Sequence, residues 1–164
     1  MLLADAQPAQ RSANAEAVNH VGMAAKLLEA LPATPGRQKM TFASMMALAF
    51  NLSTVKGIAA SEVGDDYVRA NELCDKEASS VEYCDVLIGL RVHHAVRGDV
   101  PKSLDYAEIL SRTAAETNIP ELICQGLVAE GIENYSSDDR VQESGRRRYL
   151  HRLREWTEGF PGSH

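Results

Sequence analysis

The chain has 164 residues, with 17 Lys and Arg against 23 Asp and Glu, and a net charge of −6. Hydrophobic residues make up 45% of it and aromatic residues only 5%. This length fits one domain, and the acidic balance argues against nucleic acid as the main partner. The aliphatic, aromatic-poor composition favours packed helices over a β-sandwich, because strands prefer β-branched and aromatic side chains.

The first residues, Met1 to Pro8, lack the basic segment and the apolar segment of a signal peptide. No apolar run approaches the ~20 residues that a membrane span needs. The three cysteines, Cys74, Cys84 and Cys124, have no C-x-x-C spacing, which predicts reduced core residues and neither a disulfide nor a zinc site. We therefore expect a cytoplasmic protein without membrane contact, metal or cofactor.

Apolar residues recur at helical spacing and predict about seven helices and no sheet. The first helix is expected over residues 12–31, with Pro35-Gly36 among the signals that end it. A second, over residues 40–52, is apolar nearly all round and is expected to be buried on most sides. Residues 53–60 are expected to form a loop before a third helix over 61–74.

The later helices have clearer boundary signals. Ser79-Ser80-Val81-Glu82 has the pattern of a capping box and begins the fourth helix, which ends at Gly98. Asp99-Val100-Pro101 begins the fifth helix, with proline in the first turn. Asn118-Ile119-Pro120-Glu121 repeats this pattern for the sixth. Asp138 or Asp139 is expected to begin a last helix that runs toward Trp156.

An Ala-x-x-Leu pattern recurs at Ala25, Ala70 and Ala107. After a leading helix, the chain divides into three expected hairpins over residues 38–76, 80–117 and 119–157. These features predict an all-α domain of tetratricopeptide-like antiparallel hairpins, stacked in a short right-handed superhelix. The domain is expected over residues 11–158, between flexible segments at 1–10 and 159–164.

The sequence resembles a known helical-repeat region over residues 11–135. The similarity is carried by the segments at residues 11–18, 27–37, 57–63, 67–74 and 89–99, including Tyr-Val-Arg-Ala-Asn-Glu-Leu-Cys and Gly-Leu-Arg-Val-x-x-Ala-Val-Arg-Gly-Asp. The family is a group of bacterial signalling proteins. They join a class III adenylate/guanylate cyclase domain and an AAA-type (STAND) ATPase to C-terminal tetratricopeptide-like repeats.

This chain contains no GxxxxGK[ST] phosphate loop and no cyclase-type aspartate pair, and the family pattern fades after Asp139. The resemblance therefore implies interaction and regulation without catalysis. It leaves open whether the chain is a piece of a larger protein or a short relative.

Few residues have the type and spacing of a catalytic or metal-binding site. Adjacent helical residues such as His93 and His94 point about 100° apart, so we expect one to pack in a hairpin and the other to face solvent or the groove. Glu130 and Glu133 share a helix face and are expected to be solvated. Cys84 and Cys124 have no base at a helical neighbour position. We predict no catalytic residue and no enzyme activity.

In stacked hairpins the first helix of each pair lines the concave surface, where peptides or helices bind. We therefore predict a concave partner-binding face whose carboxylates prefer a basic or amide-rich protein or peptide. It comprises Asp85, Ile88, Val92, Glu130, Glu133 and Asn134.

Residues 140–164 carry six arginines against three glutamates. Their helix either docks on an acidic surface or nucleic acid, or caps the domain by pairing with its acidic body, and we favour the capping role. The residues concerned are Arg146, Arg147, Arg148, Arg152 and Trp156.

We therefore predict a non-enzymatic protein-interaction and regulatory module of a bacterial signalling system. The alternative is a small-molecule effector sensor, with a pocket between hairpins near Met45, Met46 and residues 53–60. A homodimer is a further expectation, because short repeat modules must cover their terminal apolar faces.

Overall fold

The computed structural model describes residues 6–74, 81–117, 119–136, 150–151 and 154. Within them, every secondary-structure element is an α-helix, which confirms the predicted all-α class. Six helices have defined bounds: α1 (Ala6–Glu29), α2 (Pro35–Lys56), α3 (Ser61–Leu73), α4 (Val81–Val96), α5 (Val100–Thr117) and α6 (Pro120–Ser136). The expected seventh helix lies mostly outside the described residues.

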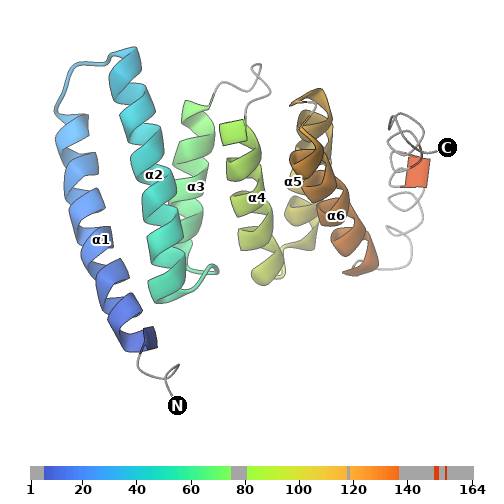
Figure 1. The fold of residues 1–164 in the computed structure, drawn as a ribbon, viewed down its shortest axis with the longest axis horizontal. Helices are drawn as coiled ribbons and strands as arrows, with labels where there is room; N and C mark the ends of the chain where they lie inside the picture. Colours follow the sequence, from blue (N-terminus) through green and yellow to red (C-terminus); the bar gives the residue numbers. More distant parts are fainter. Residues whose placement is uncertain (1–5, 75–80, 118, 137–149, 152–153, 155–164) are drawn as a thin grey trace.

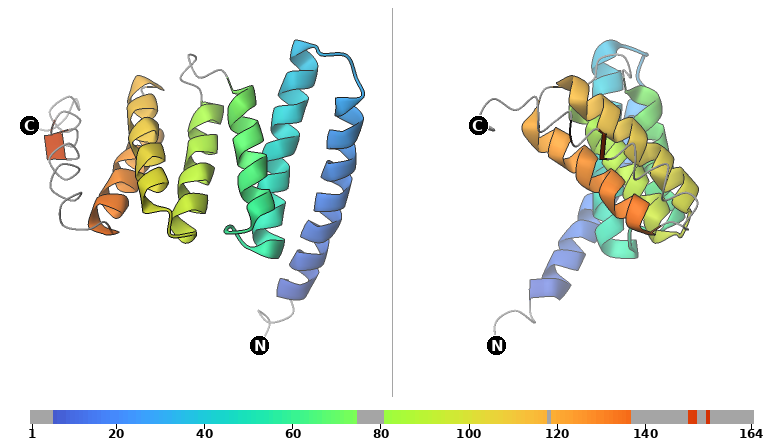
Figure 2. Two further views of the ribbon diagram at one scale, coloured as in Figure 1. Left: turned by 180° about the vertical axis from the view of Figure 1, so that it is seen from behind. Right: turned by 90° about the vertical axis from the view of Figure 1, so that its right-hand side faces the viewer.

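The six helices stand in a row in chain order and run alternately up and down (Figure 1). Each helix packs mainly on its neighbours in the chain, and the α3–α4 contact is the least extensive of these. The α1 helix forms one end of the row, and its first turns extend beyond the other helices (Figure 2). Residues 6–10, which we placed before the domain, are the first turns of this helix.

The connection between α1 and α2 corrects one prediction. Pro35 and Gly36 do not simply end a helix, because they form the first turn of α2. The Thr34 hydroxyl accepts a hydrogen bond from the backbone N–H of Arg37 at 3.2 Å, and Pro35 has no N–H to satisfy at this position. The Arg37 guanidinium also donates to the backbone carbonyl of Leu31.

The predicted loop at residues 53–60 is wrong in its first half, because α2 continues to Lys56. The hydroxyls of Ser53 and Thr54 donate to the backbone carbonyl of Phe50 at 2.7 and 3.2 Å, so both side chains bond to the helix itself. The helix ends at Gly57, whose φ of 92° favours glycine.

The start of α5 follows the prediction. Gly98 has a φ of 76° and ends α4, and Asp99 precedes the first residue of α5. The Asp99 carboxylate accepts a hydrogen bond from the backbone N–H of Lys102, which is the bond that an N-cap residue makes. The proposed capping box at Ser79 begins in residues that the structure does not describe.

Two core clusters hold the row together, and α4 belongs to both. Val86 and Leu90 of α4 lie in the first cluster, with Met45, Ala49, Leu52, Val63, Tyr67 and Ala70 among its other members. Tyr83, Cys84 and Leu87 of α4 lie in the second, with Ala107, Leu110, Ala114, Leu122 and Ala129. Two adjacent faces of α4 therefore join the two halves of the fold.

Small residues allow several helices to approach closely. A Cβ added to Gly89 of α4 would lie 2.2 Å from Cε1 of Tyr67 on α3, and one added to Gly64 would lie 2.4 Å from Nε2 of His93. Between α5 and α6, a Cβ on Gly126 would lie 2.8 Å from Cα of Ser111. Gly89 therefore allows α3 and α4 to approach closely, and Gly126 does the same for α5 and α6.

Candidate protein-binding surfaces

The predicted stripe on α4 lies at the surface. Asp85 is exposed, while Ile88 and Val92 are half-buried, and all three share one helix face. Their neighbours Cys84, Leu87 and Leu90 are fully buried, so the stripe borders the core. Desolvation raises the pKa of the Asp85 carboxyl, and the nearby charge of Glu82 raises it further.

The rest of the predicted site cannot be placed at the level of side chains. Glu130, Glu133 and Asn134 lie on α6, but their side chains are outside the described part of the chain. The basic segment with Arg146, Arg147, Arg148, Arg152 and Trp156 also lies outside the described residues. The structure therefore neither brings these residues together with the α4 stripe nor separates them from it.

A second surface, which the sequence reading missed, is an apolar groove between the outer faces of α1 and α2. Its volume is about 620 Å³. Its lining is formed by His20, Val21, Ala24, Leu27, Leu28, Leu31, Met40, Ala43, Ser44 and Ala47.

The groove exists because α1 has two apolar stripes and α2 covers only one. The covered stripe contains Val18, Val21 and Ala25, which belong to or pack against the first core cluster, and the buried Leu28. Val21 and Leu28 also form part of the groove lining. We call the other the outer stripe: Ala13, Ala17, His20, Ala24 and Leu27 of α1, and Leu31, which follows the end of the helix at Glu29. Its spacing alternates between four and three residues, which is the pattern of a coiled-coil seam.

Large apolar side chains around the groove are strongly exposed. Leu27 is 69% exposed, Leu31 53% and Met40 60%, and Phe50, three residues after the lining residue Ala47, is 67% exposed. The sequence reading expected α2 to be buried on most sides, and this is wrong for its Met40–Phe50 face. The alternating spacing was visible in the sequence, but it does not say which apolar face the chain itself covers.

The groove offers little polar chemistry. Of its lining residues, only His20 and Ser44 have polar side chains. The Ser44 hydroxyl donates to the backbone carbonyl of Met40 at 2.9 Å, so it bonds within its own helix. A groove with this lining suits the apolar face of a helix better than a polar small molecule.

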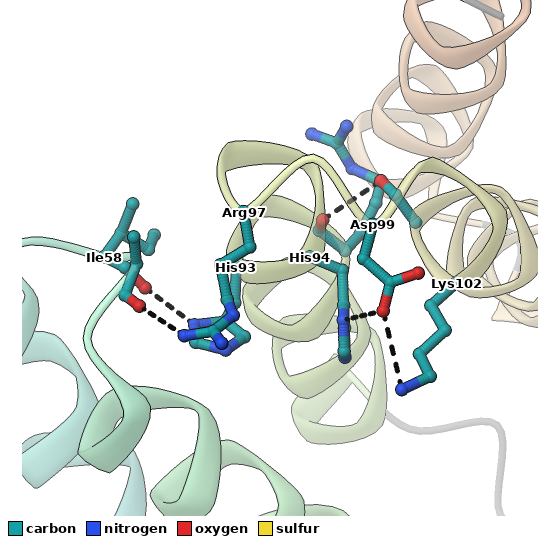
Figure 3. Close-up of polar contacts among 9 residues, drawn as sticks. Ile58, His93, His94, Arg97, Asp99 and Lys102 are labelled. Carbon is teal, nitrogen blue, oxygen red and sulfur yellow. Dashed lines mark hydrogen bonds and ion pairs between the residues drawn. The ribbon is translucent and has the colours of Figure 1, made fainter.

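The two adjacent histidines have separate structural partners (Figure 3). His93 is 5% exposed and its Nδ1 donates to the backbone carbonyl of Ile58, 2.7 Å away. His94 is half-buried, bonds through Nδ1 to Oδ2 of Asp99 at 3.2 Å and stacks on Tyr106. His93 therefore packs as expected for one of the pair, while His94 is engaged at the α4–α5 turn and does not face open solvent.

Burial lowers the pKa of His94, and this effect outweighs the opposite influence of the Asp99 carboxylate. The Lys102 backbone and side chain lower the pKa of Asp99 despite some desolvation. At neutral pH the pair is therefore a neutral imidazole that donates to an ionised carboxylate. Arg97 donates to the backbone carbonyl of Ala59 at 2.9 Å, so the α4–α5 turn is bonded to the α2–α3 connection.

The cysteines differ in environment. Cys84 is fully buried, and burial raises the pKa of its thiol. Cys124 is exposed on α6, so its prediction as a core residue is wrong. Glu121 and Val128, three residues before it and four after it on the same helix face, are also exposed, so this face of α6 meets solvent.

In the part of the chain that the structure describes, no three His, Cys, Asp or Glu side chains come together as a possible metal site. Among the same residues, no helix combines the length and apolar character needed to cross a membrane.

Comparisons of the chain with protein-family models, with curated proteins and with solved structures find no match. Among the described residues, the groove between α1 and α2 presents an apolar surface.

Proposed function

We propose that this chain is a non-enzymatic protein-interaction module, and that its α1–α2 groove holds an apolar helix of a protein partner. The observation that carries the proposal is the groove itself, an open apolar channel of about 620 Å³ rimmed by large exposed side chains. Grooves between helices bind amphipathic helices through apolar residues spaced three and four apart.

The free energy gained by covering the exposed apolar side chains of the groove is large enough to support binding of a helix. Leu27, Leu31, Met40 and Phe50 are each more than half exposed. Complete burial of such a side chain contributes ~1.5–3 kcal/mol, so covering their exposed parts is worth about 5 kcal/mol.

The titratable residues support a role without catalysis. His93 and His94 bond to a backbone carbonyl and to a capping carboxylate. The raised pKa of the Cys84 thiol makes it a poor nucleophile. These groups hold the α3–α4 and α4–α5 junctions and are not arranged around a common cavity.

The resemblance to bacterial proteins that join a cyclase and an ATPase to tetratricopeptide-like repeats supports a regulatory role in signalling. In that setting the helical row would form part of a stacked right-handed superhelix, and a partner would relay its presence to a neighbouring domain. The α4 stripe of Asp85, Ile88 and Val92 is the second surface on which a partner could be held.

Site-specific photo-crosslinking in living cells tests the proposal. We replace Leu27 by a benzophenone amino acid, and use the same replacement at the exposed Glu108 of α5 as the control. The Leu27 probe should form a covalent adduct with a protein, and adding Met40→Glu across the groove should remove it.

The control probe should not form that adduct. Absence of an adduct at Leu27, or equal adducts at both positions, would contradict the proposal. A small-molecule sensor predicts instead that metabolites raise the unfolding midpoint and that Met40→Glu abolishes this shift.

A further inference from the structure

We infer that the helix held in the α1–α2 groove is α1 of a second copy of this chain, antiparallel to the first. The inference rests on the proposed function, because it names the occupant of the same groove. It follows from the order of residues in the outer stripe and from the size of the exposed face.

The outer stripe is symmetric about position 22. In an antiparallel pair centred there, Ala17 lies opposite Leu27 and His20 opposite Ala24, and Ala13 lies opposite the segment with Leu31, just beyond the end of α1 at Glu29. The four helical positions nearest the centre are thus matched, and Leu27 meets an alanine. A two-fold contact requires a surface that is complementary to itself, and this stripe meets that requirement in spacing and in side-chain size.

A parallel pair would not have this match. It would place Leu27 against Leu27 and Ala17 against Ala17, with bulky contacts at one end and a gap at the other. An unrelated helix would have no reason to match the symmetry of the stripe. The second copy is therefore the occupant that the residue pattern fits best.

The exposed face is large enough for a dimer. The α1 and α2 helices have 24 and 22 residues, which at ~1.5 Å per residue gives lengths of about 35 Å. With axes roughly 9 Å apart, their shared outer face covers on the order of 600 Å² in projection. Stable interfaces bury about 800 Å² of accessible surface per partner, and side chains that protrude expose more area than the projection.

An acidic helix of another protein is an alternative occupant of the groove. The charge of the α1–α2 hairpin makes the two occupants differ in the salt dependence of their binding. Residues 6–56 carry five basic residues against two acidic ones: Arg11, Lys26, Arg37, Lys39 and Lys56 against Glu16 and Glu29. Glu29 is paired with Arg69 of α3 at 3.0 Å, and Lys56 is paired with Glu62 of α3. These two pairs offset each other, so the hairpin remains basic. Added salt would screen attraction to an acidic partner and weaken it, whereas it would reduce the repulsion between two copies of the same basic hairpin.

Sedimentation velocity of the full chain over a concentration series tests the inference. Wild-type protein should be a dimer, and dimerisation should be unchanged or stronger at high salt. Leu27→Glu places an uncompensated carboxylate in the interface twice and should raise the dissociation constant at least ~100-fold. Val128→Glu, at a 58% exposed valine of α6, is the matched control and should leave the dimer intact.

Chemical crosslinking tests the orientation, in a Cys124→Ala background that removes the exposed thiol. In the antiparallel pair, cysteines at position 24 are offset by ~6 Å along the helices, and those at position 13 by ~27 Å. A short bismaleimide should therefore join Ala24→Cys dimers and leave Ala13→Cys dimers unlinked. Equal crosslinking of both would indicate parallel helices and overturn the inference.

A wild-type protein that stays monomeric to ~100 μM would also overturn it, as would a dimer insensitive to Leu27→Glu. These results differ from failure of the proposed function. If the chain is monomeric but a benzophenone at Leu27 still captures a different protein, the groove binds a partner and only its identity as a second copy is wrong.

Discussion

Replacing Gly89 by alanine should destabilise the fold, although the same change usually stabilises a helix. Gly89 lies inside α4, where alanine would favour the helix by ~1 kcal/mol on propensity alone. The new Cβ, however, would lie 2.2 Å from Cε1 and 2.4 Å from Cζ of Tyr67. An ordinary contact needs at least about 3.4 Å, so the ring or the helix must move by roughly 1.2 Å.

The tyrosine ring has little freedom to move. Tyr67 is 9% exposed and belongs to the first core cluster, together with Val63 and Ala70. Forcing an extra methyl group into a packed core costs ~1–3 kcal/mol, and displacing a rigid ring lies at the upper end. After subtraction of the propensity gain, Gly89→Ala should lower the free energy of unfolding by about 2 kcal/mol.

For a chain of this size, 2 kcal/mol corresponds to a fall in Tm of about 4–8 °C. Urea denaturation followed by far-UV circular dichroism measures the change, at a fixed protein concentration because a dimer would make stability depend on it. Gly22→Ala in α1 is the matched control, because a Cβ there meets no atom within 4 Å. It should raise stability by ~0.5–1 kcal/mol. A Gly89→Ala variant as stable as wild type would refute the packing argument.

Two further predictions concern titratable groups. Because the pKa of His94 is lowered in the folded state, the unfolded chain binds more protons, and stability should fall as the pH drops below ~6.5. Urea midpoints at pH 7.5 and 5.5 measure this loss, which His94→Gln should reduce; an unchanged pH dependence would contradict the assignment. Cys124 should react with a maleimide within minutes in native protein, while the buried Cys84 should react only after unfolding. Peptide mass spectrometry separates the two, and equal native rates would show that α6 does not turn Cys124 outward.

The sequence predicted the helical class and several boundaries well, because the signals involved are local. The α4–α5 turn is an example: Gly98 supplies a positive φ and Asp99 caps the next helix, and both roles depend only on near neighbours. Pro35 shows the limit of such signals. A proline after a helix can either end that helix or begin the next one. Here Thr34 caps α2, so Pro35 is the first residue of α2.

The candidate groove could not be predicted for a different reason. Apolar spacing in α1 and α2 shows which faces avoid water, but burial depends on what packs there. Ala25 is buried in the first core cluster, while Leu27, two residues later, is 69% exposed in the open groove. Likewise, the pattern around Cys124 did not show which side of α6 meets α5. Only the arrangement of the helices in space distinguishes a covered stripe from an open one.

The position of α4 in both core clusters has a consequence for how the chain can be shortened. A helix at either end of the row has one neighbour, so its removal uncovers one face of the molecule. Removal of α4 would uncover Met45 and Val63 on one side and Ala107 and Leu110 on the other. We therefore expect that fragments ending before residue 81 cannot form a stable first cluster, since Val86 and Leu90 complete it. The smallest piece that folds alone must contain α4, whichever end is trimmed.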